Sequence, residues 1–165
     1  MKDTFDPRRA AVEQQESLTE LKRRLEGHVK MLAQTIGPRS NQLYPESLER
    51  AATYLEDAWQ KQGYDVRRQT YPYQGEGFSF PGSIYREGVG VNLEVTVRGR
   101  EKPEEIVVIG AHYDSAWHAP GADDNASGVA VLLEISREMR SAMPANTVRL
   151  VAFSNEEVPY FGKIF

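Results

Sequence analysis

Three short clusters of polar residues in the last third of the sequence carry side chains that commonly bind metal ions. Imidazole nitrogens and carboxylate oxygens are ligands for borderline and hard divalent cations. The clusters are His112 with Asp114, Asp123 with Asp124, and Glu156 with Glu157. The sequence has no cysteine, so any metal site here must use nitrogen and oxygen ligands.

The first cluster, His112 and Asp114, follows the apolar run at residues 106–109, which predicts a buried strand. Side chains two residues apart on a strand point to the same side, so the imidazole and the carboxylate are expected to stand together. A carboxylate that accepts a hydrogen bond from one ring nitrogen fixes the imidazole for metal binding through the other. Taken alone, the pair also fits an ordinary capped turn.

The second cluster lies in the glycine-bounded loop at residues 121–128, just before a helix predicted over about 125–140. Helix N-terminal capping explains one of the two carboxylates. The small residues on either side of the two aspartates let the backbone come close to a bound group. The second carboxylate is therefore explained if it is oriented towards a cation.

The third cluster, Glu156 and Glu157, follows a buried strand predicted over residues 146–154. A crossover helix joins this strand to the strand before His112, so the two strands are expected to be parallel and to end at the same sheet edge. Adjacent side chains point apart, so one glutamate can bind a metal while the other takes a proton from a metal-bound water. Two surface glutamates in a turn are the alternative, but the three clusters together favour a metal site.

The elements that must position these clusters alternate between helix and strand. Apolar spacing predicts helices over about 7–34 and 45–62, the first polar in its first half. A half-exposed strand at 64–71 is expected to end at Pro72, followed by a surface loop or loose hairpin at 74–90. A strand at 89–97 should pair with the next strand as an antiparallel hairpin. The pattern predicts an α/β fold with a mixed β-sheet flanked by helices.

The 165 residues amount to one domain, and 20 basic against 24 acidic residues give a net charge of -4. This balance excludes nucleic acid as the expected partner. No apolar leader and no membrane-spanning run occurs in the sequence, so no membrane partner and no targeting signal are expected. Nothing in the sequence indicates an oligomeric state.

The motifs His112-Tyr113-Asp114-Ser115, Gly-Ala-Asp-Asp-Asn-Ala-Ser-Gly at 121–128 and Asn155-Glu156-Glu157 resemble those of co-catalytic dizinc aminopeptidases. This family is of the bacterial leucyl aminopeptidase and glutamate carboxypeptidase type. The resemblance covers roughly residues 32–162. It implies a zinc-peptidase (phosphorylase/hydrolase-like) fold, two Zn2+ ions in the complete domain, and a peptide substrate. The implied reaction is hydrolysis of N-terminal residues through a metal-activated water.

The resemblance also implies a role for each site residue. His112 and Glu157 would each bind a metal ion, and Asp124, rather than Asp123, would bridge the two ions. Asp114 would orient His112, and Glu156 would act as the general base.

The family's site takes a further Asp and a further His from later segments, whereas this sequence ends at Phe165. Neither His28 nor His118 matches the missing ligand. We therefore expect an N-terminal amphipathic helix at 1–35 and a C-terminally truncated peptidase domain at 36–165, which binds zinc weakly and is inactive alone. The alternatives are a glutaminyl cyclase-like enzyme with one zinc, or a catalytically dead binding module of the same fold. The choice between aminopeptidase and carboxypeptidase stays open.

Overall fold

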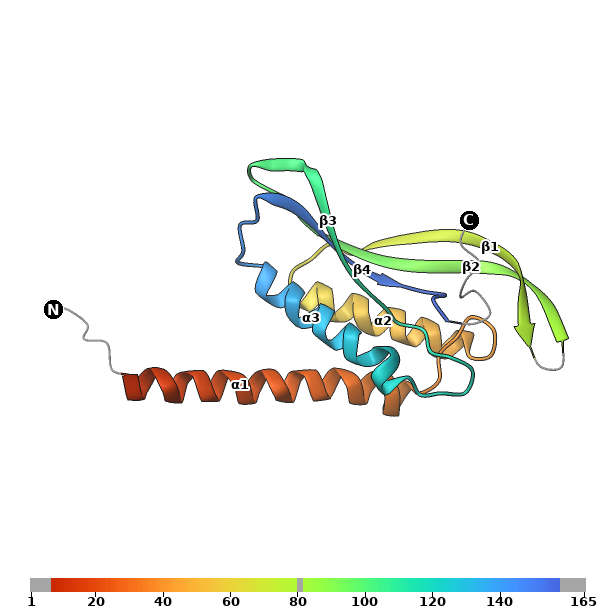
Figure 1. Cartoon of the computed structure of the whole chain (residues 1–165), viewed down its shortest axis with the longest axis horizontal. Coiled ribbons are helices and arrows are strands. Elements are labelled where there is room, and N and C mark those ends of the chain that lie inside the picture. Colours follow the sequence, from red (N-terminus) through yellow and green to blue (C-terminus); the bar gives the residue numbers. More distant parts are fainter. Residues whose placement is uncertain (1–6, 80–81, 158–165) are drawn as a thin grey trace.

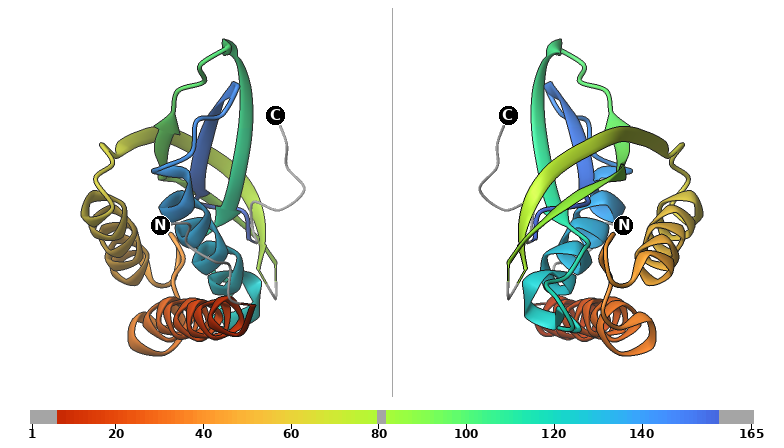
Figure 2. Two further views of the ribbon diagram at one scale, coloured as in Figure 1. Left: turned by 90° about the vertical axis from the view of Figure 1, so that its left-hand side faces the viewer. Right: turned by 90° about the vertical axis from the view of Figure 1, so that its right-hand side faces the viewer.

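The computed structural model describes residues 7–79 and 82–157. The predicted order of elements is confirmed, and the fold is α/β with a four-stranded mixed sheet. Helices α2 and α3 lie along one face of the sheet, and α1 crosses beneath them (Figure 1 and Figure 2). The elements are α1 (Pro7–Lys30), η1 (Met31–Ile36), α2 (Pro45–Lys61), β1 (Arg67–Ser79), β2 (Gly82–Val97), β3 (Lys102–His112), η2 (Ala122–Ser127), α3 (Gly128–Met139) and β4 (Asn146–Phe153).

The strand order is β1-β2-β4-β3, with β3 parallel to β4 and the other pairs antiparallel. The parallel pair was predicted from the crossover helix and is confirmed. The predicted hairpin between β2 and β3 is wrong, because β4 lies between them. The link at 98–101 crosses the start of β4, where the N–H of Gly99 donates to the hydroxyl of Thr147 at 3.1 Å. A Cβ on Gly99 would collide with the backbone of Asn146, so this crossing requires glycine.

Of the two alternatives predicted for residues 74–90, a surface loop or a loose hairpin, the structure has a hairpin, formed by β1 and β2. Strand β1 continues through Pro72 and pairs with β2 from Arg67↔Glu94 to Ser79↔Gly82. Proline is tolerated because β1 is the outer strand of the described sheet, where a missing N–H need not break a ladder. The rings of Tyr71 and Tyr73 lie where side chains at Gly90 and Gly88 would be. The glycines therefore accommodate aromatic rings across the hairpin instead of breaking the strand.

The prediction that residues 106–109 form a buried strand is wrong about burial. Ile106, Val107 and Val108 are 47%, 46% and 57% exposed. Strand β3 is the last strand of the sheet among the described residues, so only β4 pairs with it there. Strand β4, by contrast, is buried at Val148 and Leu150, as predicted.

The core lies between the sheet and one stripe each of α2 and α3, as the apolar spacing predicts. The first helix packs through its second half, and Leu18 nearer its start is 53% exposed. It ends with the turn η1 at Gly37, whose φ of 81° suits glycine and whose N–H donates to Leu32 at 3.0 Å. Among the described residues, no helix has the length and apolarity needed to cross a membrane. The buried core side chains on the two sheet-facing helices are Leu48, Ala51, Ala52, Leu55, Trp59, Val129, Leu132, Leu133 and Ser136.

Candidate metal centre

The candidate site lies at the carboxyl ends of the two parallel strands. His112 is the last residue of β3 and pairs in register with Phe153, the last residue of β4. Glu156 and Glu157 lie three and four residues after the end of β4, and Asp124 lies in η2, between β3 and α3. The parallel register therefore brings together the three clusters that the sequence separates by up to 45 positions, counted from residue 112 to residue 157.

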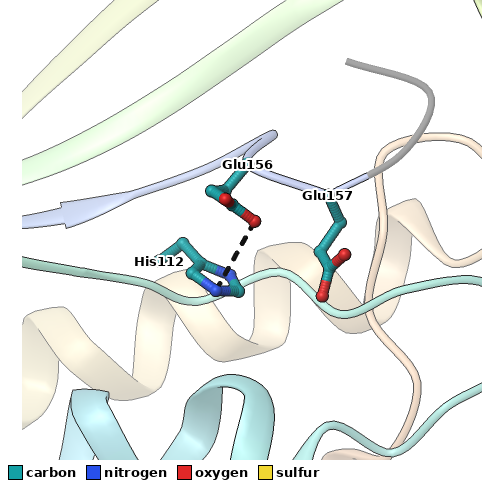
Figure 3. Close-up of side chains that lie close together, drawn as sticks. All are labelled: His112, Glu156 and Glu157. Atoms are coloured by element: carbon teal, nitrogen blue, oxygen red, sulfur yellow. Dashed lines mark ion pairs between the residues drawn. The ribbon is translucent and has the colours of Figure 1, made fainter. Parts of the chain in front are cut away.

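His112 is the centre of this group. Its Nε2 lies 2.9 Å from Oδ1 of Asp124 and 3.6 Å from Oε2 of Glu156. His112, Glu156 and Glu157 each offer a ligand atom, and these three atoms lie within 4.8 Å of one another (Figure 3). One imidazole and several carboxylates at this spacing form a nitrogen and oxygen donor set that fits zinc.

Excess negative charge surrounds the imidazole. Burial by itself would lower the pKa of His112, but the carboxylates of Asp114, Glu156 and Asp124 outweigh burial and raise the pKa to about 9. The pKa of Glu157 is raised by burial first and then by the charge of Asp124. In the absence of a cation, a proton on His112 therefore balances part of this charge, and a metal ion would take over that role.

Asp114 is 3% exposed and has contacts beyond the one predicted. Its Oδ1 lies 3.4 Å from Nδ1 of His112, close enough for an ion pair but not aligned as a good hydrogen bond. The same carboxylate accepts backbone N–H groups from Glu156 at 3.3 Å and from Glu157 at 3.0 Å. Asp114 therefore joins the end of β3 to the segment that follows β4, a contact that no sequence pattern revealed.

Of the two adjacent aspartates, Asp124 turns its carboxylate towards His112. The backbone carbonyl of Asp123 accepts the hydroxyl of Ser127 at 2.7 Å. The N–H of Gly128 donates to Oδ1 of Asn125 at 3.0 Å, so an asparagine side chain, and not an aspartate, satisfies this donor at the start of α3.

The other two histidines lie in other environments, as the sequence predicts. His118 is exposed and its Nδ1 lies 2.5 Å from the hydroxyl of Tyr44. His28 lies on α1, with its Nε2 3.4 Å from Glu134 on α3. Neither belongs to the metal-capable group found among the described residues.

The fold is that of zinc exopeptidases and their structural relatives. A zinc aminopeptidase from Bacillus subtilis is similar with a TM-score of 0.65 and 14% identity over 81% of this chain and 61% of that chain. Glutaminyl cyclase from Fimbriiglobus ruber is similar with a TM-score of 0.64 and 22% identity over 83% of this chain and 46% of that chain. The shared shape alone does not separate these two activities.

The sequence comparisons are more specific. Residues 92–163 match the family model described as Peptidase family M28, in agreement with the resemblance that the motifs carry. Aminopeptidase YwaD of Bacillus subtilis is 43% identical over 61 residues, which are 37% of this chain and 13% of YwaD. The uncharacterized Escherichia coli protein YfbL is 36% identical over 145 residues, 83% of this chain and 40% of YfbL. The chain thus spans less than half the length of these curated relatives.

Proposed function

We propose that this chain carries part of the catalytic centre of a zinc-dependent aminopeptidase that removes N-terminal residues from peptides. The observation that carries the proposal is the approach of Asp124 and Glu156 to Nε2 of His112, with Glu157 within ligand distance. The match of residues 92–163 to Peptidase family M28 supports the same reaction class.

In the proposed arrangement, His112, Asp124 and Glu157 hold zinc, and Asp114 holds the imidazole and the backbone after β4 in place. Bound zinc supplies a Lewis acid and lowers the pKa of water at the site. Glu156 takes the proton from the attacking water and returns it to the leaving amine. Its carboxylate is 44% exposed at the side-chain level, so solvent and substrate can reach it.

Two ions are proposed for the whole peptidase centre. The described part of the metal-capable cluster supplies only one imidazole, His112. We therefore expect the 165-residue chain, purified by itself, to bind zinc weakly and to lack peptidase activity. Robust zinc-dependent hydrolysis of an aminoacyl nitroanilide by this chain would contradict that expectation.

Zinc binding by the purified chain tests the proposal. Titration calorimetry and metal analysis should detect zinc, and zinc should raise the melting temperature in a way that a chelator reverses. The His112→Ala variant should lose this response. The His118→Ala variant, which removes an exposed histidine outside the cluster, should keep it. A wild-type chain that binds no zinc, or a His112→Ala variant that binds it equally well, would refute the proposed centre.

A glutaminyl cyclase-like reaction is the second candidate, because the fold also matches glutaminyl cyclases. Metal analysis of a longer protein that contains this segment separates the two: two zinc ions per chain indicate the peptidase, and one indicates the cyclase. No bound zinc would indicate a binding module.

A further inference from the structure

Arg39 is a fully buried arginine outside the proposed ligand set. It lies in the loop between η1 and α2 and is 0% exposed. We propose that Arg39 is a positioning residue for the metal centre: its guanidinium fixes the loop at 113–121 so that His112 and Asp124 keep facing each other. This inference rests on the proposed metal-dependent function and assigns a role to a residue that would not touch the metal.

The guanidinium joins both ends of that loop. Its Nε donates to the carbonyl of Tyr113 at 2.6 Å, directly after His112. Its two terminal nitrogens donate to the carbonyls of Pro120 at 2.6 Å and Gly121 at 3.0 Å, directly before η2. One side chain therefore holds the residue after one proposed ligand and the residues leading to another.

The backbone of Arg39 adds a second connection to the same loop. Its N–H donates to the hydroxyl of Ser115 at 3.1 Å, and its carbonyl accepts the N–H of Ser115 at 2.8 Å. The side chain also donates to Leu32 and Gly37, at 3.3 Å and 3.2 Å, which anchors the loop to the end of the first helix. The loop is thus attached to the end of the first helix, which carries none of the proposed ligands.

Arginine suits this position because its planar group presents five N–H donors in fixed directions. Burial lowers the pKa of Arg39 to about 10, opposed by the charge of Asp114, so the group stays protonated at neutral pH. Burying a cation is unfavourable unless its donors are satisfied, and here backbone carbonyls satisfy them. A lysine ammonium donates from a single point and cannot match this spread.

The loop itself is shaped for this contact. Gly121 has a φ of 57°, in the left-handed region, and a Cβ there would lie 3.2 Å from Nη2 of Arg39 and 2.5 Å from the carbonyl of Asp124. Glycine therefore lets the guanidinium approach the turn that carries Asp124. Asn41, two residues after Arg39, donates a hydrogen bond to Asn155, directly before Glu156. The loop after η1 consequently contacts both sides of the site.

Hydrogen exchange on the metal-free chain gives the first test, because it does not depend on zinc. In Arg39→Met, amides at 113–126 should exchange about tenfold faster or more relative to wild type. Leu55→Ala removes core packing on α2 and serves as the control, since Leu55 is fully buried and remote in sequence from the loop. When Leu55→Ala and wild type are each measured at the same interval below their own melting temperature, exchange of the amides at 113–126 should be the same in both. Equal exchange in Arg39→Met and wild type would overturn the proposal.

Zinc affinity gives the second test. Arg39→Lys keeps the positive charge but loses the planar guanidinium with its fixed N–H directions. It should weaken zinc binding about tenfold, the usual lower bound for the loss of a residue that supports metal ligands. It also carries the test if Arg39→Met does not fold. Arg39→Lys with wild-type zinc affinity and wild-type loop exchange would overturn the role of Arg39. A wild-type chain without zinc binding would instead refute the proposed metal function, and the exchange result would still decide whether Arg39 fixes the loop.

Discussion

The carboxylate of Asp114 accepts a hydrogen bond from the backbone N–H of Glu157 at 3.0 Å, across 43 positions of sequence. The same side chain lies beside Nδ1 of His112. A carboxylate that the sequence indicates only as a partner of the imidazole therefore also fixes the backbone that carries the two glutamates.

Asp114→Asn should weaken both stability and metal binding. The amide retains one acceptor oxygen, so one of the two backbone N–H groups that Asp114 now accepts loses its partner. The expected loss is about 1–3 kcal/mol in the free energy of unfolding and about 10–100-fold in zinc affinity. Urea unfolding and titration calorimetry measure the two effects. Asp65→Asn, at an exposed position, is the control, and a urea midpoint no lower than the control's would contradict the prediction.

The two glutamates should respond differently to the loss of charge. Glu157→Gln should weaken zinc binding about tenfold or more, as expected for a ligand. Glu156→Gln should leave zinc affinity nearly unchanged, because a general base acts on the water and does not hold the ion. Calorimetric titration of both variants checks this. Equal losses would assign Glu156 as a ligand as well, which its position within 4.8 Å of the other ligand atoms would then explain.

The interface of α1 with α3 should make stability depend on pH. Burial is the main reason why the pKa of His28 lies below 6.5, and the positive charges of Arg137 and Arg24 lower it as well. The carboxylate of Glu134 raises the pKa but does not offset these effects. The unfolded chain then binds this proton more readily, so the contribution of His28 to stability is full above pH 6.5 and is lost as the pH falls below that value.

Removal of this imidazole tests that dependence. The stability of wild type relative to His28→Gln should be greater at about pH 7.5 than at about pH 5, measured by urea unfolding at both values. His118→Gln, at an exposed histidine, serves as the comparison. A difference between wild type and His28→Gln that stays constant with pH would count against the prediction.

A buried hydroxyl should also contribute measurably to stability. The indole N–H of Trp59 donates to the hydroxyl of Ser136 at 2.9 Å, and both side chains are 0% exposed. Ser136→Ala leaves that donor without its partner and should cost about 1–3 kcal/mol. Ser141→Ala, at an exposed position just after α3, is the control and should change the free energy of unfolding little. Urea unfolding that finds the two variants equally stable would disprove the expectation.

The local elements and the parallel strand pair were predictable, because apolar periodicity is local and crossover connections follow a general rule. The insertion of β4 beside β2 was not, since strand pairing is decided by contacts distant in sequence. Pro72 was predicted to end a strand, but an outer strand of the described sheet tolerates the proline. The glycines at 74–90 favoured a loop or a loose hairpin, and within the hairpin the ring of Tyr73 covers Gly88.

The clustering of the candidate site was predictable to a similar degree. His112 ends β3, Asp124 lies in η2 and the two glutamates come after β4, so the crossover unit brings these residues together. Their individual roles stay predictions. The role of Arg39 could not be predicted from the sequence, because its side chain binds backbone carbonyls, and carbonyls are the same in every residue.

The exposure of β3 has a consequence for the behaviour of the purified chain in solution. An apolar strand at the end of a sheet presents a template on which another chain can add, and Ile106, Val107 and Val108 form such a stretch. Glu104 and Glu105 directly precede this apolar stretch, and the repulsion between their charges and those of an added chain opposes the addition. Aggregation of the metal-free chain should therefore begin at β3 and accelerate when Glu104 and Glu105 are both replaced by glutamine.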